Sequence, residues 1–184
     1  MMEDLAMHTL EIVMNSVHAG AKNIKIEITD SAAGDELVIS VTDDGKGMDE
    51  ETARKAADPF YTSRTTRKIG MGLAFMKGLA ETCSGTFTLN SVPGEGTVVR
   101  ASVQRSNIDT PPPGDFGQML MESIQANGET EYEFVYITDD GRFEFDTASA
   151  REMLDGVDIL EPEVLLWIRE YINEGINSVK EGTQ

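Results

Sequence analysis

Residues Leu37–Met48 read Leu-Val-Ile-Ser-Val-Thr-Asp-Asp-Gly-Lys-Gly-Met, and this stretch decides how the rest of the chain is interpreted. Its first half is rich in apolar and β-branched residues, which predicts a buried strand. Its second half, Asp43–Gly47, would place carboxylates at the mouth of a sheet, and its glycines would let the backbone turn closely around a ligand. Asp-Asp-Gly is also an ordinary turn sequence, so its meaning depends on what precedes and follows it.

The composition is that of a globular protein without a membrane span. The chain has 184 residues, 40% of them hydrophobic, which suffices for one domain and a small appendage. No apolar run approaches the roughly 20 residues of a membrane helix. The first four residues include Glu3 and Asp4 where a signal peptide carries basic residues, so we expect a cytoplasmic protein. Cys83 is the single cysteine, which excludes an internal disulfide and disfavours a Cys/His metal site.

Charge divides the chain into two parts. Residues 1–106 contain 11 Lys and Arg against 15 Asp and Glu, whereas residues 107–184 contain 4 against 18. A net charge of −18 argues against binding to nucleic acid or to an anionic membrane. Three consecutive prolines in the segment 107–114 predict a stiff linker between a domain at 1–106 and an acidic module at 115–184.

Hydrophobic periodicity predicts an α/β protein. The apolar spacing favours helices over 3–19, 73–83, 116–126, 149–154 and 162–179, with a short helix opening at 49–51. Alternation favours strands over 24–28, 37–41, 87–90, 97–103, 132–138 and 142–145. The short turn between the first two strands favours an antiparallel pair. The tail therefore reads as an αββαα module. The stretch 58–71 has no periodicity, and a loop of that length is commonly functional.

Glu11 and Asn15 lie four residues apart, so they share one face of the first predicted helix. A buried hydrogen-bonded pair, or a position at the boundary of the core, is one interpretation of two polar residues on a mostly apolar face. The other is that the Asn15 amide oxygen binds Mg²⁺, which prefers oxygen ligands, and that Glu11 orients or deprotonates the group that attacks a phosphate.

Five short motifs follow one another in a characteristic order. They are Glu11-x-x-x-Asn15-Ser16, Asp43-x-Gly45-x-Gly47, Pro59-Phe60, Gly70-x-Gly72-Leu73 and Gly94-x-Gly96-Thr97. In this order and spacing the chain resembles the GHKL ATPase superfamily, which includes DNA gyrase, heat-shock chaperones of the ninety-kilodalton class, histidine kinases and MutL proteins. The resemblance covers about residues 5–105. It implies a two-layer α/β fold, with a mixed, mostly antiparallel sheet and helices on one face.

The resemblance also implies a role for each motif residue. Asp43 is similar to the aspartate that accepts a hydrogen bond from the adenine amino group, and Thr97 to a strand threonine near it. Asn15 is similar to the asparagine that binds magnesium. Two sets complete the implied ATP site, namely the turn glycines Gly45 and Gly47, and the lid and phosphate-hinge residues Thr62, Ser63, Arg64, Gly70, Met71 and Gly72. Met48, Phe60 and Leu73 would wall the base pocket, although ordinary core positions are the alternative.

Within the superfamily, the lid phrase 58–64 and the run 70–103 look most like a histidine-kinase catalytic domain, which implies a role in signalling. Glu11 departs from that branch, which usually has asparagine there, and resembles gyrase, MutL and anti-sigma kinases. His18 stands where histidine kinases usually carry lysine. The chain begins near its first catalytic helix and His8 is its only early histidine, so we expect no autophosphorylation of the usual kind. These features favour ATP binding over turnover.

Two smaller signals have plain interpretations. Asp139-Asp140-Gly141 echoes the opening stretch, but Phe143 stands where the second glycine would be, so we expect a hairpin turn. Cys83 is expected to be a small buried side chain rather than a redox sensor.

We therefore expect a protein that binds Mg-ATP and acts, as an ATPase or protein kinase, on or with a separate partner protein. Glu11 is the candidate catalytic base. The alternatives are a non-catalytic, ATP-gated interaction switch and a degenerate relative that binds no nucleotide. The sequence indicates neither the partner nor the oligomeric state.

Overall fold

The computed structural model describes residues 4–60 and 71–181. Its helices are α1 (Leu5–His18), α2 (Glu50–Ala56), α3 (Gly72–Thr82), α4 (Phe116–Ala126), α5 (Thr147–Leu154) and α6 (Pro162–Lys180). Its strands are β1 (Asn23–Ser31), β2 (Glu36–Asp43), β3 (Phe87–Val92), β4 (Gly96–Gln104), β5 (Glu131–Thr138) and β6 (Arg142–Asp146). The predicted helices and strands of both parts of the chain are found in the predicted order.

All six strands form one sheet in the order β3-β4-β2-β1-β5-β6. Neighbouring strands are antiparallel except β1 and β5, which run parallel. The antiparallel pairing predicted for the first two strands is confirmed, with Ile26 opposite Val41. Because β5 pairs with β1, the acidic segment 115–184 extends the sheet that the first half of the chain begins.

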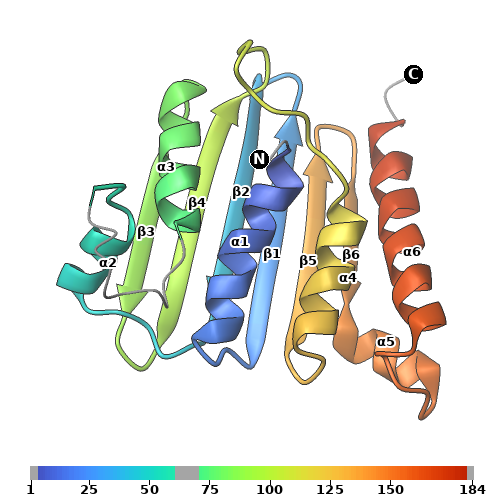
Figure 1. The fold of residues 1–184 in the computed structure, drawn as a ribbon. Coiled ribbons are helices and arrows are strands. Elements are labelled where there is room, and N and C mark those ends of the chain that lie inside the picture. Colours follow the sequence, from blue (N-terminus) through green and yellow to red (C-terminus); the bar gives the residue numbers. More distant parts are fainter. Residues whose placement is uncertain (1–3, 61–70, 182–184) are drawn as a thin grey trace.

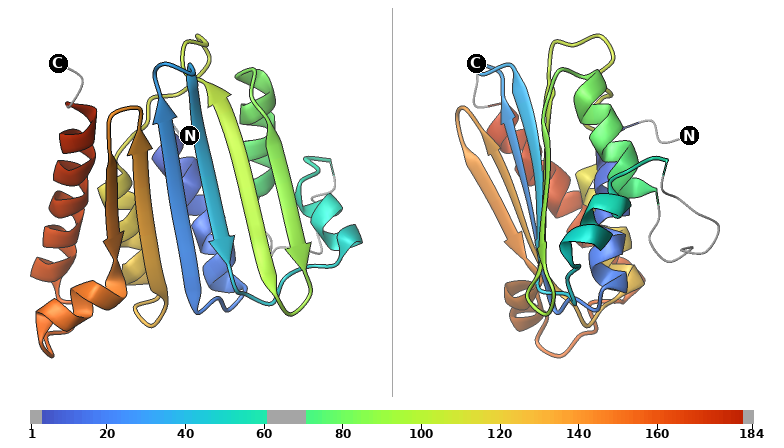
Figure 2. Two further views of the ribbon diagram at one scale, coloured as in Figure 1. Left: turned by 180° about the vertical axis from the view of Figure 1, so that it is seen from behind. Right: turned by 90° about the vertical axis from the view of Figure 1, so that its left-hand side faces the viewer.

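The molecule has two layers (Figure 1). Helices α1, α3 and α4 cover one face of the sheet, and α6 packs beside α4 along the end formed by β5 and β6. Seen from behind, the other face carries no helix in the described part of the chain (Figure 2). The predicted fold class, a mixed and mostly antiparallel sheet with helices on one face, is confirmed. None of the described helices is long and apolar enough to cross a membrane.

The core lies between the sheet and the helices. Ile24, Ile26 and Ile28 of β1 point into it at every second position, and each is at most 1% exposed. Tyr132 and Phe134 of β5 stand beside the first two of these isoleucines in register and belong to the same buried cluster. Full burial of a side chain of this size stabilises the fold by about 1.5–3 kcal/mol, so the β1–β5 contact contributes substantially to stability.

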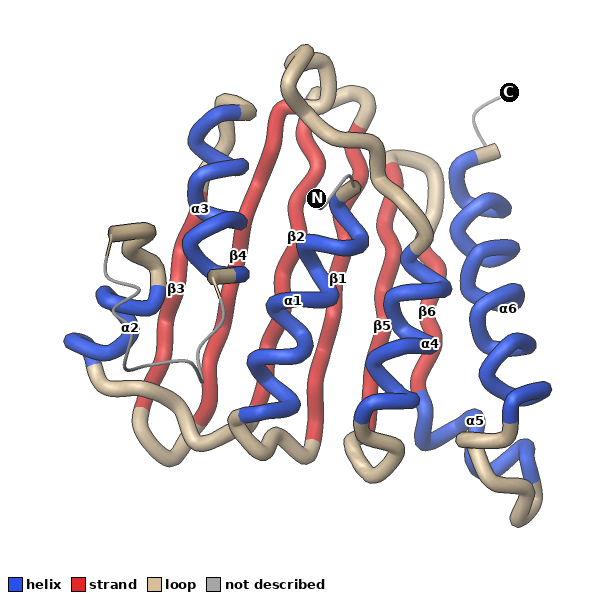
Figure 3. Tube along the Cα trace, viewed as in Figure 1, coloured by secondary structure: helices blue, strands red, loops and turns tan. Residues whose placement is uncertain are grey.

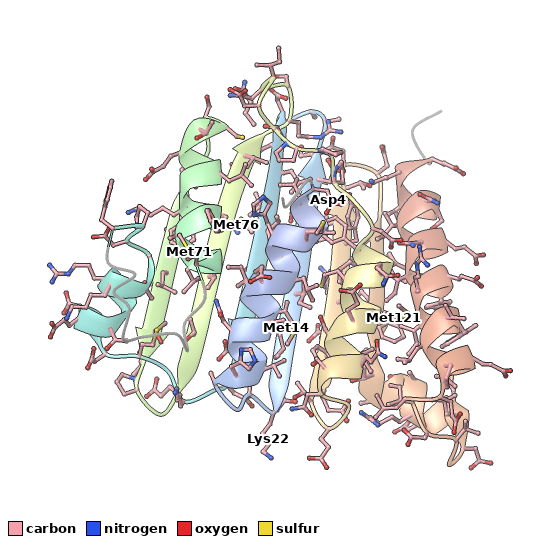
Figure 4. The ribbon with its side chains drawn as sticks, in the orientation of Figure 1. Asp4, Met14, Lys22, Met71, Met76 and Met121 are labelled. Atoms are coloured by element: carbon pink, nitrogen blue, oxygen red, sulfur yellow. The ribbon has the colours of Figure 1, made fainter. Side chains whose placement is uncertain are left out.

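The proline-rich segment packs against the start of α1. The backbone N–H groups of Leu5 and Ala6 donate to the carbonyls of Pro112 and Pro113 at 3.0 and 2.9 Å. Asp4 caps the same helix by accepting from the N–H of Met7 at 2.8 Å, and Figure 4 marks Asp4 beside this segment. The first three N–H groups of α1, which have no partner inside the helix, are therefore all satisfied.

A buried carboxylate ties the two halves of the sheet together. Asp30 of β1 is only 7% exposed, and it accepts from the Tyr136 hydroxyl of β5 at 2.8 Å. Arg105, just beyond β4, lies 2.7 Å from its other oxygen. Burial, and then the charge of Asp30, hold the pKa of Tyr136 well above its usual value, so the hydroxyl stays a donor. An unpaired carboxylate here would cost several kcal/mol, and these partners offset that cost.

Candidate functional site

One large cavity opens between the helical layer and the end of the sheet where β2 stops. It has a volume of about 770 Å³ and is enclosed by α1, the loop after β2, the start of α2, the start of α3 and strand β4. Figure 3 shows that the loop after β2 and the β3–β4 turn meet at this end of the sheet. The lining residues are Ile12, Asn15, Ser16, His18, Ala19, Asp43, Lys46, Gly47, Met48, Asp49, Thr52, Leu73, Pro93, Thr97 and Val99.

Asp43 is the last residue of β2 and its carboxylate is held in one orientation. Its Oδ1 accepts from the backbone N–H of Gly45 at 2.9 Å, and its Oδ2 accepts from the hydroxyl of Ser16 at 2.5 Å. Ser16 is buried on α1, so helix and strand are joined across the cavity floor. A carboxylate has about four acceptor positions, so Asp43 can still accept a hydrogen bond from a ligand.

Thr97 stands directly opposite Asp43 in the β2–β4 register, and both residues line the cavity. Its hydroxyl lies 2.7 Å from the Ser91 hydroxyl of β3. Ser91 in turn accepts from the backbone N–H of Met48 at 2.8 Å. Two neighbouring strands and the loop after β2 are therefore connected behind the polar end of the cavity.

The loop after β2 needs glycine where it packs on the β3–β4 turn. Gly47 has a φ of +66°, and a Cβ built there would lie 2.0 Å from the carbonyl oxygen of Val92. The loop is held on both sides by the backbone of Lys46. Its N–H donates to the carbonyl of Ala19 at 3.0 Å, and its carbonyl accepts from the N–H of Gly94 at 2.7 Å. A side chain at position 47 would separate the two turns that close this end of the cavity.

The two adjacent aspartates of the opening stretch differ in their contacts. Asp44 does not line the cavity and accepts from the backbone N–H groups of Lys22 and Asn23 at 2.7 and 2.9 Å, and from the Asn23 amide at 2.9 Å. Its small degree of burial raises the pKa of Asp44, but the hydrogen bonds from Asn23 and Lys22 outweigh that effect and lower it overall. Asp44 therefore holds the loop against β1, whereas Asp43 lines the cavity.

Asn15 contributes an unpartnered polar group to the cavity. Its Nδ2 is buried and has no hydrogen-bond partner in the described part of the chain. The structure therefore gives no support to the interpretation of a buried hydrogen-bonded pair with Glu11. Rotating the amide exchanges its oxygen and nitrogen at little steric cost, so the side chain can present either atom to a ligand.

Glu11 lies one turn before Asn15, beside the start of α3. A Cβ built on Gly72 would lie 2.9 Å from the Cβ of Glu11, so α1 and α3 approach closely at this point. Glu11 is exposed and does not line the cavity. Helix α3 has no side-chain cap at its N-cap residue Met71, which Figure 4 marks at its first turn. Its first N–H groups have no partner within the helix and are oriented to receive an anion.

Only some of the remaining predicted site residues lie at the cavity. Met48 and Leu73 line the cavity, and Gly45 is buried beside Asp43. Met71 and Phe60 are exposed and do not line the cavity. Phe60 is 96% exposed, and its backbone N–H donates to the Asp58 carboxylate at 2.9 Å. Four predicted residues, Thr62, Ser63, Arg64 and Gly70, lie outside the described part of the chain.

Several lining residues were not predicted. Ile12 and Val99 form apolar walls, and both could have been found from periodicity, since they stand three before Asn15 on the helix and two after Thr97 on the strand. Ser16 follows Asn15 directly, but its bond to Asp43 joins residues 27 positions apart and has no local signal. Asp49 caps α2, and hydrogen bonding from the Thr52 N–H lowers its pKa.

Two other predicted features, the burial of Cys83 and the hairpin turn after β5, are found. Cys83 is fully buried. Asp139-Asp140-Gly141 lies in the hairpin turn between β5 and β6, where the N–H of Thr138 donates to the carbonyl of Gly141 at 2.9 Å. Among the described residues, no group of three or more His, Cys, Asp or Glu is placed to hold a metal ion.

Comparison with known proteins finds relatives of the part of the chain that contains this cavity. The family described as histidine kinase-, DNA gyrase B-, and HSP90-like ATPase matches residues 3–107. The "Non-motile and phage-resistance protein" of Caulobacter vibrioides is 34% identical over 99 residues, which are 49% of this chain and 12% of that protein. The "Sensor histidine kinase YxdK" of Bacillus subtilis is 31% identical over 97 residues, which are 50% of this chain and 30% of that protein.

Among solved structures, the Aquifex aeolicus MutL ATPase domain complexed with ADP aligns with 84% of this chain and 68% of its own, at a TM-score of 0.49 and 17% identity. The matched region is only a small part of the two curated relatives. This chain spans 12% of the length of the first and 30% of the length of the second. The family match covers more than half of the chain and includes α1, β2, the start of α3 and β4. The chain therefore belongs to the family of histidine kinase-, DNA gyrase B- and HSP90-like ATPases, whose match covers residues 3–107.

Proposed function

We propose that the cavity binds ATP together with Mg²⁺, and that the protein transfers or releases the terminal phosphate in concert with a separate partner protein. The observation that carries this proposal is the orientation of Asp43. Two hydrogen bonds fix its carboxylate inside a cavity of about 770 Å³ that also contains the unpartnered amide of Asn15. A partly buried acceptor and a buried amide nitrogen without a partner in one cavity are arranged for a polar ligand.

The Asp43 end suits adenine. The exocyclic amino group of adenine is a hydrogen-bond donor, and Asp43 offers it a charged acceptor, which makes a stronger bond than a neutral one. Guanine would instead present a carbonyl oxygen to the same carboxylate, and the two acceptors would repel each other. Apolar walls for the ring come from Ile12, Met48, Leu73 and Val99.

The part of the cavity lined by Asn15 and by Leu73 at the start of α3 suits phosphates and their cation. The Asn15 amide oxygen would supply one ligand to Mg²⁺, and the phosphate oxygens and water would supply the others, because Mg²⁺ keeps several waters and prefers oxygen. The uncapped N-terminus of α3 would receive phosphate oxygens through its backbone N–H groups. When bound, Mg²⁺ would neutralise charge on the phosphates.

In the catalytic form of this proposal, Glu11 accepts the proton of the attacking hydroxyl or water. The bond from the γ-phosphorus to the bridging oxygen breaks, a new bond to the attacking oxygen forms, and ADP leaves with the electron pair. The acceptor is a group on the partner protein or water. One observation favours a second candidate, an ATP-gated switch without chemistry: Glu11 is exposed and does not line the cavity.

The first test is calorimetric titration of Mg-ATP into the full chain. Replacing the acceptor in Asp43→Asn should weaken ATP binding by roughly 1.5–3 kcal/mol, about 10- to 150-fold in Kd. Asp109→Asn makes the same chemical change on an exposed loop and should leave Kd unchanged. Thermal unfolding of both variants checks that the Ser16 bond is not needed for folding. Undiminished ATP binding by a folded Asp43→Asn variant would contradict the proposed site.

Glu11→Gln separates the two forms of the proposal. If Glu11 is the base, phosphate release or transfer should fall by about 10²–10⁴-fold while the Kd for ATP changes little. If the protein is only a switch, the wild type itself releases no phosphate above background, and the substitution changes nothing measurable. Phosphate release that Glu11→Gln leaves intact would remove Glu11 from the mechanism.

A further inference from the structure

Helix α6 exposes large apolar side chains outside the stripe that it packs against the core. Leu166 is 50% exposed, and Trp167 and Tyr171 are each 41% exposed. The buried residues of the same helix, Leu165, Ile168, Ile172 and Ile176, form a separate stripe that faces the core. Figures 1 and 2 show α6 as the outermost helix at the β6 end of the molecule. Clustered exposed aromatic and leucine side chains are typical of binding surfaces.

Trp167 is held firmly although it is exposed. Its ring stacks on Tyr171 with centroids 5.2 Å apart and planes 23° apart. Tyr171 packs in turn against Phe143 and Phe145 of β6, with centroids at 5.6 and 6.1 Å. The rings therefore form a continuous row from the edge strand to the surface. An ordered aromatic side chain loses little conformational entropy when a partner covers it, which favours binding.

The apolar side chains are interleaved with acidic ones. Glu163, Glu170 and Glu174 are exposed and occur at helical spacing, so they lie on the same face of α6 as Leu166 and Trp167. Within residues 4–60 and 71–181, none of these glutamates forms an ion pair. The four basic residues after position 106 pair with other carboxylates, namely Arg142 with Glu144, Arg151 with Glu131, Arg169 with Asp115 and Lys180 with Asp30.

We propose that this outer face of α6, formed by Glu163, Leu166, Trp167, Glu170, Tyr171 and Glu174, binds a basic amphipathic helix of another protein. The partner's apolar residues would cover Leu166 and Trp167, and its lysines or arginines would pair with the three glutamates. The negative charge decides against the other occupants. A second copy of this chain would place glutamates against glutamates, and an anionic membrane or a nucleic acid would be repelled.

The probe for this test is a synthetic peptide of about 18 residues, long enough to match most of α6 as a helix. Leucines form one of its faces and lysines the other, and it contains no tryptophan. Trp167 is the only tryptophan in the chain, so its emission reports directly on this surface. Adding the peptide to the full-length protein should shift that emission to shorter wavelength, and binding should weaken as salt increases. A peptide with glutamate in place of lysine should not bind.

Charge reversal at the surface supplies the matched control. Glu170→Lys should weaken binding of the basic peptide about tenfold or more. Glu81→Lys makes the same change of net charge on exposed α3, far from α6, and should have little effect. Trp167→Ala, followed by the anisotropy of a labelled peptide, should also weaken binding about tenfold or more. Thermal unfolding of each variant establishes that it is folded.

Three results would overturn the proposal. Equal binding of the basic and acidic peptides would show that charge does not select the occupant. Equal effects of Glu170→Lys and Glu81→Lys would mean that the peptide responds only to net charge. Sedimentation of the full chain as a dimer that Trp167→Ala dissociates would assign the face to a second copy.

Discussion

Two glycines where the loop after β2 meets the β3–β4 turn have very different surroundings although both have positive φ. Gly47 has a φ of +66° and touches the Val92 carbonyl, whereas Gly94 has a φ of +79° and open space, with nothing within 4 Å of the point that a Cβ would occupy. Only the first glycine is therefore required both for its backbone conformation and for a close approach. Substituting alanine at each position therefore separates the free-energy cost of a left-handed backbone from the cost of steric overlap with the Val92 carbonyl.

We predict that Gly94→Ala lowers the free energy of unfolding by about 1–2 kcal/mol, the usual cost of a left-handed alanine. Gly47→Ala should lower it by about 3 kcal/mol or more, because the Val92 carbonyl must also move. Urea unfolding of the two variants measures both values. Equal losses would show that the loop after β2 and the β3–β4 turn separate freely, and that close packing does not close the cavity there.

At the scale of elements, α4 and α6 pack so closely that one helix has no room for a side chain. A Cβ on Gly117 of α4 would lie 2.3 Å from the backbone carbonyl oxygen of Arg169 on α6. The contact is reinforced by Asp115, which accepts from Arg169 at 2.8 Å and from Asn173 at 2.8 Å. The position of the exposed face of α6 is therefore determined by backbone contact with α4.

Gly117→Ala should destabilise the fold by about 1–3 kcal/mol, since overpacking forces the two helices apart. Gly78→Ala is the matched change at an exposed position of α3, where nothing lies within 4 Å of the added Cβ. It should stabilise the protein by about 0.5–1 kcal/mol through helix propensity. Thermal or urea unfolding distinguishes the signs, and a neutral Gly117→Ala would mean that α6 shifts without cost.

At the scale of the whole molecule, one sheet and one buried cluster include residues from both parts of the chain. Each part contains a unique probe, because Cys83 is the only cysteine and Trp167 the only tryptophan. We predict that urea exposes the Cys83 thiol and shifts the Trp167 emission with the same midpoint, since a shared core unfolds cooperatively. Two separate midpoints would instead indicate independent units on either side of residues 107–114.

Local signals were sufficient for most of the elements. Alternation predicted the β1 strand, and the acidic opening at 49–51 predicted α2, which Asp49 caps. Pairing between distant strands has no such signal. The parallel contact of β5 with β1 depends on the packing of Tyr132 and Phe134 beside the β1 isoleucines, which no local pattern specifies.

The site was predictable to a similar extent. The structure places Asp43, Asn15 and Thr97 in the lining of one cavity, while their roles in binding stay predictions. The Ser16 hydroxyl that orients Asp43 could not be foreseen, because only the packing of α1 over β2 brings the two together. The exposed position of Phe60 likewise depends on how the chain runs beyond α2, and sequence spacing does not determine that path.

The parallel pairing of β1 has a consequence for synthesis on the ribosome. Asp30 and Tyr136, which bond across β1 and β5, lie 106 residues apart in the chain. At about 5–20 residues per second, β1 therefore leaves the ribosome about 5–20 s before the strand that covers its second edge. During this interval the nascent chain exposes an isoleucine-rich edge, which is where strands of other molecules add most readily. Chaperone demand should thus be greatest between completion of β4 and emergence of β5.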